Sequence, residues 1–186
     1  MENYPLFGRV VNSAAAHIRG VDSTGIIAEF KRKSPSKGLI NGTADVSETT
    51  RGYVRAGVAC LSSKEVMNLS EFAHELGLEV LLEVHDADEL ARSLCNTVDL
   101  VGVNNRNLKT FETSVETSLQ LVNQIPASFV RVTESGLHDA ATILMLREAG
   151  YDAFLIGEAF MKTTAPDVAL AALVGQLNKQ KFANPL

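Results

Sequence analysis

Three apolar runs that stop on functional groups decide how this chain folds: LEVLLEV (78–84), DLVGVN (99–104) and FVRVTE (129–134). A strand with one face in water alternates apolar and polar side chains along its whole length. These runs instead stay largely apolar until they reach Glu83, Asn104 and Glu134. This pattern is typical of buried parallel strands whose last residues lie together at one edge of the sheet and form an active site. It therefore indicates an enzyme with a parallel sheet.

Expected strands and helices alternate along the rest of the chain. Further strands are expected at 25–30, 57–62 and 152–157, and helices at 47–56, 64–76, 86–95, 114–124, 139–149 and 165–178. Gly77 and Gly150 follow two of these helices as C-terminal stops, and Asp139 stands where an N-cap is needed. A short turn is expected over 158–163, and the tail from residue 178 is expected to be frayed.

Six βα units in strict alternation predict a parallel sheet with helices outside it. No Gly-x-Gly-x-x-Gly motif follows the first strand and no Walker A motif occurs, so a nucleotide-binding fold loses support. Functional groups at several strand ends favour a TIM-type (β/α) barrel over an open sheet. We expect a single domain, 1–186, whose barrel is two units short of the usual eight.

Composition narrows the class of protein. The net charge is −5 and the isoelectric point about 5.4, which argues against a nucleic-acid binder. No apolar stretch reaches about 18 residues, so no membrane span is expected. The N-terminus lacks the order of a signal peptide, and the cytoplasm is the predicted location. Cys60 and Cys95 lie in or near apolar segments and are expected to be buried, reduced thiols.

The first strand ends on an acid and a base, Glu29 and Lys31, two residues apart. Residues i and i+2 of a strand face the same side, so both side chains are expected in one cavity, each shifting the pKa of the other. The alternative is a surface ion pair at the barrel mouth. The apolar strand that precedes the two residues favours the cavity.

Two later strand ends carry further candidates. Apolar neighbours would raise the pKa of Glu83 toward general acid–base use, although a buried acid paired for stability is supported about equally. Asn104 and Arg106 suit the binding of a carboxylate or a polar intermediate. The alternative there is a simple turn, which consecutive asparagines favour.

Two glycine-bearing loops follow the last two strands. Glu134-Ser135-Gly136 opens one loop and Gly157-Glu158 opens the other. Glycine lets backbone N–H groups approach a ligand closely, and such a pair of loops at the end of a βα series is the usual phosphate site of barrel enzymes. The predicted ligand is a phosphorylated small molecule.

The four histidines do not predict a metal site. None of His17, His74, His85 and His138 stands at metal-ligand spacing with another His, Cys or acid. His85 follows a strand end, where a substrate contact is possible and a structural role is favoured.

Five stretches together resemble the indole-3-glycerol phosphate synthase family of tryptophan biosynthesis: IIAEFKRKSPSKG (26–38), HELGLEVLLEVHDADEL (74–90), VGVNNRNLKTFE (101–112), RVTESGLHDA (131–140) and FLIGEAFM (154–161). The resemblance implies a (β/α)₈ barrel and a carbon–carbon lyase that needs no cofactor. The implied reaction is ring closure, decarboxylation and dehydration of 1-(2-carboxyphenylamino)-1-deoxyribulose 5-phosphate, which gives indole glycerol phosphate.

The resemblance also implies roles for individual residues. It implies catalysis by Glu29, Lys31, Glu83, Asn104 and Glu134, and substrate binding by Arg106 and Ser135. Ser34, Gly136, Gly157 and Glu158 fall in the family's phosphate-binding loops. Residues 1–24 match a partial form of the family's N-terminal extension.

The chain departs from the family in its middle. The Arg-Lys-Asp-Phe motif of the third strand, whose lysine is a general acid, does not occur. GVACLSS resembles the second strand yet runs into KEVMNLSEFAHELG, which resembles the fourth helix, so about two βα units, on the order of 60 residues, are missing between Ser63 and Glu65. Loss of two strands would expose two sheet edges and favour oligomers or poor solubility.

Three functions remain open at this stage. The leading hypothesis is a synthase of this family. The second is a catalytically impaired remnant that binds a phosphorylated ligand or a protein partner. The third is another sugar-phosphate barrel enzyme such as an isomerase, against which EFKRKSPSKG and NNRNLKTF argue.

Overall fold

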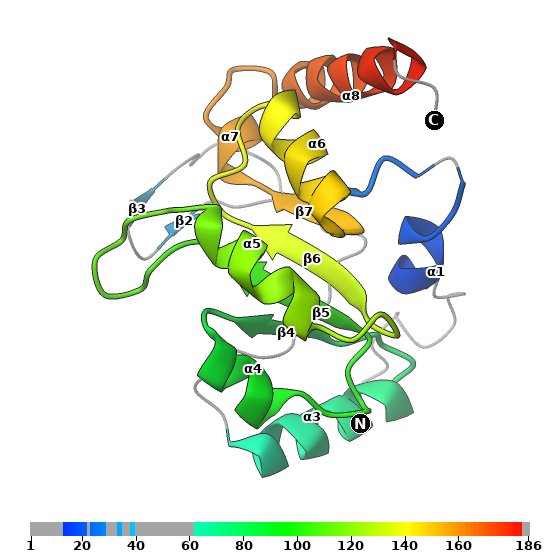
Figure 1. Ribbon diagram of the computed structural model, residues 1–186, viewed down its shortest axis with the longest axis vertical. Coiled ribbons are helices and arrows are strands. Elements are labelled where there is room, and N and C mark those ends of the chain that lie inside the picture. Colours follow the sequence, from blue (N-terminus) through cyan, green and yellow to red (C-terminus); the bar gives the residue numbers. More distant parts are fainter. Residues whose placement is uncertain (1–12, 22, 29–32, 35–37, 40–61, 184–186) are drawn as a thin grey trace, which may run out of the picture.

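The computed structural model describes residues 13–21, 23–28, 33–34, 38–39 and 62–183 (Figure 1). Its main sheet has five parallel strands in the order β1-β7-β6-β5-β4. Their bounds are β1 Ile26–Ala28, β4 Leu81–Val84, β5 Leu100–Asn104, β6 Val130–Glu134 and β7 Ala153–Ile156. A separate antiparallel pair joins β2 (Lys33–Ser34) to β3 (Gly38–Leu39).

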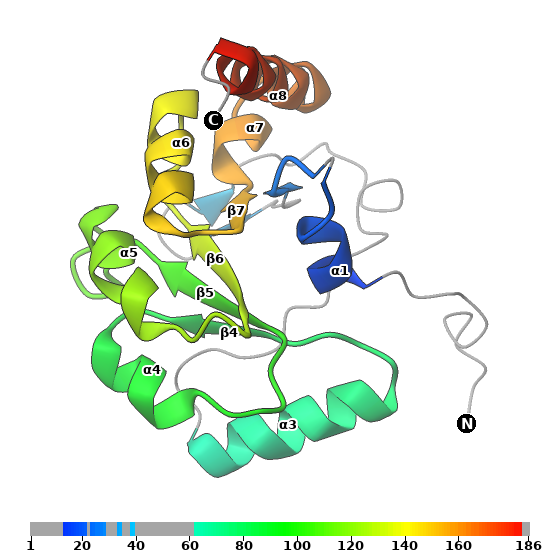
Figure 2. The same ribbon diagram turned by 45° about the vertical axis from the view of Figure 1, so that its right-hand side comes forward.

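The helices lie on both sides of the sheet, but unequally. Figures 1 and 2 show α4, α5 and α6 on one side and α1 on the other. The helices are α1 Ala14–Ile18, α3 Ser63–Glu75, α4 Ala87–Ser93, α5 Glu116–Leu121, α6 Ala140–Ala149, α7 Glu158–Met161 and α8 Pro166–Ala183, with a 3₁₀ turn η1 Val122–Gln124. Each strand from β4 to β7 is thus followed by a helix, the alternation that the sequence predicts.

Local side chains fix where these helices begin. Ser62 and Glu65 form a capping box at the start of α3, in which each side chain bonds to the other's backbone N–H. Asp86 caps α4, and the predicted cap Asp139 accepts a hydrogen bond from the N–H of Thr142 at the start of α6. These bonds satisfy donors that the first turn of a helix leaves without a partner.

Glycines end two helices as predicted. Gly77 (φ +73°) follows α3, and Gly150 (φ +115°) is the left-handed residue at the end of α6. A residue with a Cβ is strained in this conformation, so glycine is the usual stop.

The two faces of the sheet bury different cores. Alternate residues of the strands face the helices in one apolar cluster, which includes Leu82, Val84, Val101, Val103, Phe154 and Ile156. The intervening residues face the other way, into a smaller cluster of Leu81, Leu100, Val130, Val132 and Ala153. The helix α1 covers this smaller cluster with Ala15 and Ile18. Glu79 holds α1 in place, because its carboxylate accepts hydrogen bonds from the backbone N–H groups of the first turn.

The sheet agrees with the predicted topology where the structure describes it. The first strand pairs with the last, Ile26 opposite Phe154, as in a sheet that is closing into a barrel. Within the described residues β1 pairs only with β7 and β4 only with β5, so both edges face the part of the sheet where further strands of a barrel would lie. The expected strand 57–62 and helix 47–56 fall outside the described residues except for Ser62.

Two local predictions are wrong. Residues 158–163 were expected to form a turn, but α7 occupies Glu158–Met161; four residues are too few to display a helical period. The tail was expected to fray from residue 178, but α8 continues to Ala183, since the sequence has no glycine or proline between residue 178 and Pro185.

Two further expectations concern the thiols and the membrane. Cys95 is a free cysteine, as predicted, but is only half-buried, and Cys60 lies outside the described residues. In the described part of the chain, no helix has both the length and the apolar character that a membrane span requires.

Candidate active site

Three polar side chains meet where three neighbouring strands end. Glu83 lies on β4, Asn104 on β5 and Glu134 on β6, and all three are buried. The register sets Asn104 opposite Glu134 and Glu83 opposite Gly102, so the three side chains share the face of the sheet that turns away from the helices. Asn104 Nδ2 donates a hydrogen bond of 2.8 Å to Glu83 Oε1. The structure thus brings together three of the residues that the sequence singled out.

Gly102 creates the space for one of these acids. A Cβ at this position would lie 3.2 Å from Glu134 Oε1 and 3.2 Å from Leu81 Cδ1. A carboxylate therefore lies where any larger residue on β5 would place its side chain. Sequence analysis missed this role, because a glycine within an apolar run shows only that a small residue is tolerated.

Arg106 connects the strand ends to the last loop. Its backbone N–H donates to Asn104 Oδ1 at 2.9 Å, and its guanidinium donates to Glu158 Oε2 at 3.1 Å. Lys162 also contacts the Glu158 carboxylate, one helical turn further along. Two cations therefore hold the side chain of Glu158, a residue predicted to contact phosphate, and only its backbone N–H is suited to an anion.

Ser135 and Gly136 form a tight left-handed turn after β6. Their φ angles are +69° and +76°, which is unusual for a serine. A Cβ on Gly136 would lie 2.5 Å from Thr113 Cγ2, so this turn packs directly against the loop that follows β5. Glycine is therefore required at position 136 for two reasons: the left-handed backbone conformation and the close contact with Thr113.

Asn105 holds this turn in place and was missed by sequence analysis. Its Nδ2 donates to Thr133 Oγ1 at 3.0 Å and to the Ser135 carbonyl at 3.1 Å. Its Oδ1 accepts from the Ser118 N–H at 3.2 Å and from Ser118 Oγ at 2.8 Å. Consecutive asparagines indicate a turn from sequence, whereas here the second one joins β5, β6 and α5 through a fully bonded amide.

A buried tyrosine supports Asn105 from behind. Tyr151 donates a hydrogen bond of 2.9 Å from its hydroxyl to the Ser118 carbonyl. Burial raises the pKa of Tyr151 to about 12, although the Ser118 side chain and the positive charge of Arg131 act in the opposite direction. The phenol therefore stays neutral and keeps its proton as a donor at any physiological pH.

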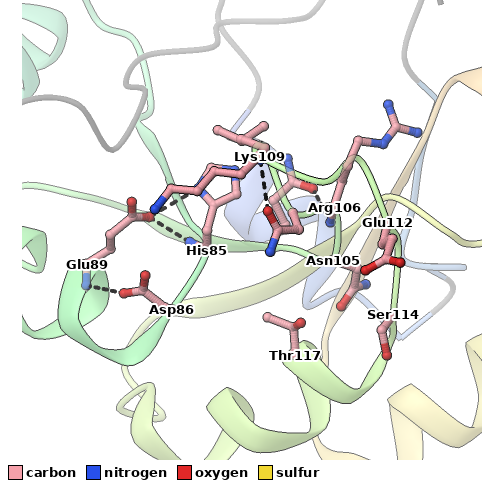
Figure 3. A pocket seen from close by; sticks show the side chains of 12 residues that line it. His85, Asp86, Glu89, Asn105, Arg106, Lys109, Glu112, Ser114 and Thr117 are labelled. Carbon is pink, nitrogen blue, oxygen red and sulfur yellow. Dashed lines mark hydrogen bonds and ion pairs between the residues drawn. The ribbon is translucent and has the colours of Figure 1, made fainter. Parts of the chain in front are cut away.

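A pocket of about 500 Å³ opens beside the strand ends, between the start of α4 and the loop after β5 (Figure 3). It is lined by His85, Asp86, Glu89, Asn104, Asn105, Arg106, Asn107, Leu108, Lys109, Glu112, Ser114 and Thr117. Most of these side chains are polar, and Asn104 and Arg106 link the pocket to the residues described above.

Other predicted site residues are described only in part or not at all. Glu29 and Lys31 lie outside the described residues; Ala28, just before them, pairs with Ile156 on β7. Ser34 belongs to β2, but its side chain is outside the description. Gly157 is buried between β7 and α7, next to Glu158. In the described ranges, no three His, Cys, Asp or Glu side chains are placed to share a metal ion.

Comparison with protein families gives one clear relationship. The sequence profile of the indole-3-glycerol phosphate synthase family matches residues 12–63 and, separately, residues 58–173. The two matches meet at residues 58–63, next to the place where the sequence predicts missing βα units.

Individual relatives agree with the profile. The chain is similar to indole-3-glycerol phosphate synthase of Bacteroides thetaiotaomicron, with 37% identity over 204 aligned positions that cover 79% of this chain and 78% of that protein. The enzyme of the same name from Koribacter versatilis is 48% identical over 207 positions, covering 81% and 80% of the two chains. Both alignments are longer than the 186 residues of this chain, so each relative carries residues that have no counterpart here.

Solved structures support the fold alone. 3-Hexulose-6-phosphate synthase from Salmonella typhimurium aligns with a TM-score of 0.55 and 12% identity, over 68% of this chain and 62% of that one. A mandelate oxidase with benzoyl-formic acid aligns with a TM-score of 0.53 and 18% identity, over 66% of this chain and 38% of that one. Together with the family profile, these likenesses confirm the predicted TIM-type (β/α) barrel, shortened within the chain.

Proposed function

Because the chain belongs to the indole-3-glycerol phosphate synthase family, a family of carboxy-lyases, we propose that it acts on the substrate of that family. The reaction converts 1-(2-carboxyphenylamino)-1-deoxyribulose 5-phosphate to indole glycerol phosphate by ring closure, with loss of CO₂ and water. This sequence of steps needs groups that give and take protons, a group that fixes the substrate, and a site for its phosphate.

The buried pair of Glu83 and Asn104 is the observation that carries this proposal. Both side chains are buried, and the 2.8 Å hydrogen bond from the Asn104 amide holds the Glu83 carboxylate in a fixed orientation at the strand ends. A carboxyl group held in this way can act as a general acid or base toward a bound substrate. In this proposal Glu83 exchanges protons with the substrate, while Asn104 orients the carboxylate and Glu134 acts from the neighbouring strand.

The remaining roles are proposed on the family pattern. Arg106 and Ser135 bind the substrate, and Arg106 must exchange Glu158 for a substrate anion when it does so. Ser34, Gly136, Gly157 and Glu158 contribute to the phosphate site. Glu29 and Lys31, which follow β1 in the sequence, supply the second acid–base pair.

The shortened middle of the chain favours a second candidate function. The Arg-Lys-Asp-Phe motif is absent from the sequence, so we infer that this chain lacks the lysine which serves as a general acid in the family. Loss of general acid catalysis costs about 10² to 10⁴ in rate, unless Lys31 substitutes. The second candidate is therefore an impaired remnant that keeps the phosphate site and binds a phosphorylated ligand or a protein partner.

One assay separates the two candidates. Purified protein is tested for indole glycerol phosphate formation, with Glu83→Gln as the test variant and the exposed Glu148→Gln on α6 as its matched control. We expect Glu83→Gln to lower turnover by about 10² to 10⁴ and Glu148→Gln to leave it unchanged. A folded wild-type protein that binds a substrate analogue but gives no product would instead support the remnant.

We also propose that residues 1–186 form one barrel domain, with residues 1–24 as a partial N-terminal extension. The cytoplasm remains the predicted location. Oligomerisation through exposed strand edges also remains a prediction, and a size measurement that finds a stable, well-folded monomer would count against it.

A further inference from the structure

His85 lies between two carboxylates at the end of β4. Its Nδ1 is 3.1 Å from Glu89 Oε2, and its Nε2 is 3.7 Å from Glu83 Oε1. The imidazole is largely buried, with 12% of its side chain exposed. On one side of the ring lies the proposed proton-exchanging acid Glu83. On the other side lies Glu89 of α4, to which no role has been assigned (Figure 3).

Glu89 fixes the direction in which the imidazole points. Its Oε2 accepts from the backbone N–H of His85 at 2.8 Å, and its own N–H donates to the N-cap Asp86 at 2.8 Å. The carboxylate is thus held by the start of α4 and in turn holds Nδ1. In this orientation Nε2 faces Glu83 Oε1.

The second nitrogen is buried without a hydrogen bond in the described part of the chain. A gap of 3.7 Å to Glu83 is longer than a hydrogen bond, but a small rotation of the Glu83 side chain closes it. Bonds between catalytic groups are often long before substrate binds. Both ring nitrogens thus face carboxylate oxygens, and an imidazolium ring donates from both nitrogens.

We propose that His85 is a positioning residue for Glu83: Glu89 orients the ring, and Nε2 donates to Glu83 Oε1 and holds that carboxylate toward the substrate. This inference rests on the proposed function, because it assigns His85 to the acid that exchanges protons there. The same pocket is also lined by the charged groups Asp86, Arg106, Lys109 and Glu112. The test therefore uses variants that leave those groups unchanged.

The first experiment does not depend on turnover. Nitrogen-15 NMR of histidine-labelled protein follows the ring nitrogens of His85 in wild type and in Glu83→Gln. We expect the Nε2 resonance of His85 to shift on this substitution, while the resonances of His17 and His74 stay in place. An unchanged Nε2 resonance in folded Glu83→Gln protein would overturn the proposal.

The second experiment compares two amide replacements of the ring. In His85→Gln the amide nitrogen reaches the place of Nε2 and keeps a donor toward Glu83. In His85→Asn the amide nitrogen occupies the place of Nδ1 and keeps only the contact with Glu89. We expect His85→Asn to lower kcat by about 10- to 100-fold with KM little changed, and His85→Gln to keep most of the turnover.

The outcomes distinguish the positioning role of His85 from the synthase function on which it rests. If His85→Asn is as active as wild type, or more active than His85→Gln, the ring serves only to start α4 and the proposal is wrong. If wild-type protein has no turnover but Glu83→Gln still shifts the Nε2 resonance, the contact between His85 and Glu83 stands and the synthase function fails.

Discussion

The outer face of the sheet is mostly apolar, and its polar residues Arg131 and Thr133 on β6 have hydrogen-bond partners. The inner face is apolar at one end and polar at the other. On the outer face, Val101, Val103 and Phe154 are fully buried under the helices. On the inner face, Leu81 and Val130 pack beneath α1, but two residues further along β4 the side chain is Glu83. The same strands therefore bury an apolar core on the outer face. On the inner face they bury a smaller apolar core at one end and carry the candidate active-site residues at the other.

This difference between the two faces shows where the sheet can hold polar side chains. Helices remove the outer face from water, so a polar side chain there would need a bonded partner within the core. Among the described residues, α1 covers one end of the inner face, and Asn104, Glu134 and Glu83 stand at the other end. We expect changes on the outer face to act on stability and changes at the inner strand ends to act mainly on function.

The largest effect is expected for Phe154→Ala on the outer face. Phe154 has no exposed surface, and its removal leaves a cavity that surrounding side chains fill poorly. The free energy of unfolding should fall by about 3–5 kcal/mol, as measured by chemical denaturation. Phe72→Ala on α3 is the matched control, because Phe72 is 58% exposed and its loss should change stability by less than about 0.5 kcal/mol. Equal effects of the two changes would contradict the assignment of the core.

A smaller effect is expected from Tyr151, which donates a hydrogen bond to the carbonyl of Ser118, a partner of Asn105. Its pKa is raised to about 12 by burial, so the unfolded chain ionises first as the pH rises above 10. The free energy of unfolding is therefore unaffected by this group below pH 10. It falls by about 2–3 kcal/mol in total as the pH rises from 10 to 12. Denaturation at several pH values should show this loss in wild type, and Tyr151→Phe should remove it. The same slope in both proteins would show that Tyr151 is not its cause.

The smallest change in stability is expected for Gly102→Ala on the inner face. The added methyl group meets Glu134 Oε1 and Leu81 at 3.2 Å, so the carboxylate must move. We expect a loss of about 1–2 kcal/mol in stability, together with a fall in turnover that this loss does not explain. Gly175→Ala on α8 is the control, since nothing lies within 4 Å of the added Cβ, and helix propensity should make it slightly stabilising. Full turnover in Gly102→Ala would show that Glu134 does not take part in the reaction.

What the sequence predicts well is local or periodic. The strand ends at Glu83, Asn104 and Glu134 follow from apolar runs, and the cap Asp139 and the stops Gly77 and Gly150 act within one helical turn. Each of these features depends on neighbours along the chain, which a single sequence displays.

What the sequence does not predict depends on contacts between distant residues. Asn105 bonds to Ser118, Thr133 and Ser135, and no spacing in the sequence shows that these three residues converge. The His85 ring is likewise oriented by a contact with Glu89 across the start of α4. Such roles appear only when side-chain positions are known.

The pairing of β1 with β7 has a consequence for how the protein is made. The ribosome releases residues 26–28 early, but their neighbour Ala153–Ile156 leaves it only near the end of synthesis. The strands β4 to β7 follow one another in order and can join the sheet as they emerge, whereas β1 must wait for its place beside β7. Contacts between residues so far apart in the chain form slowly. Translation therefore makes the first strand a late addition to the sheet.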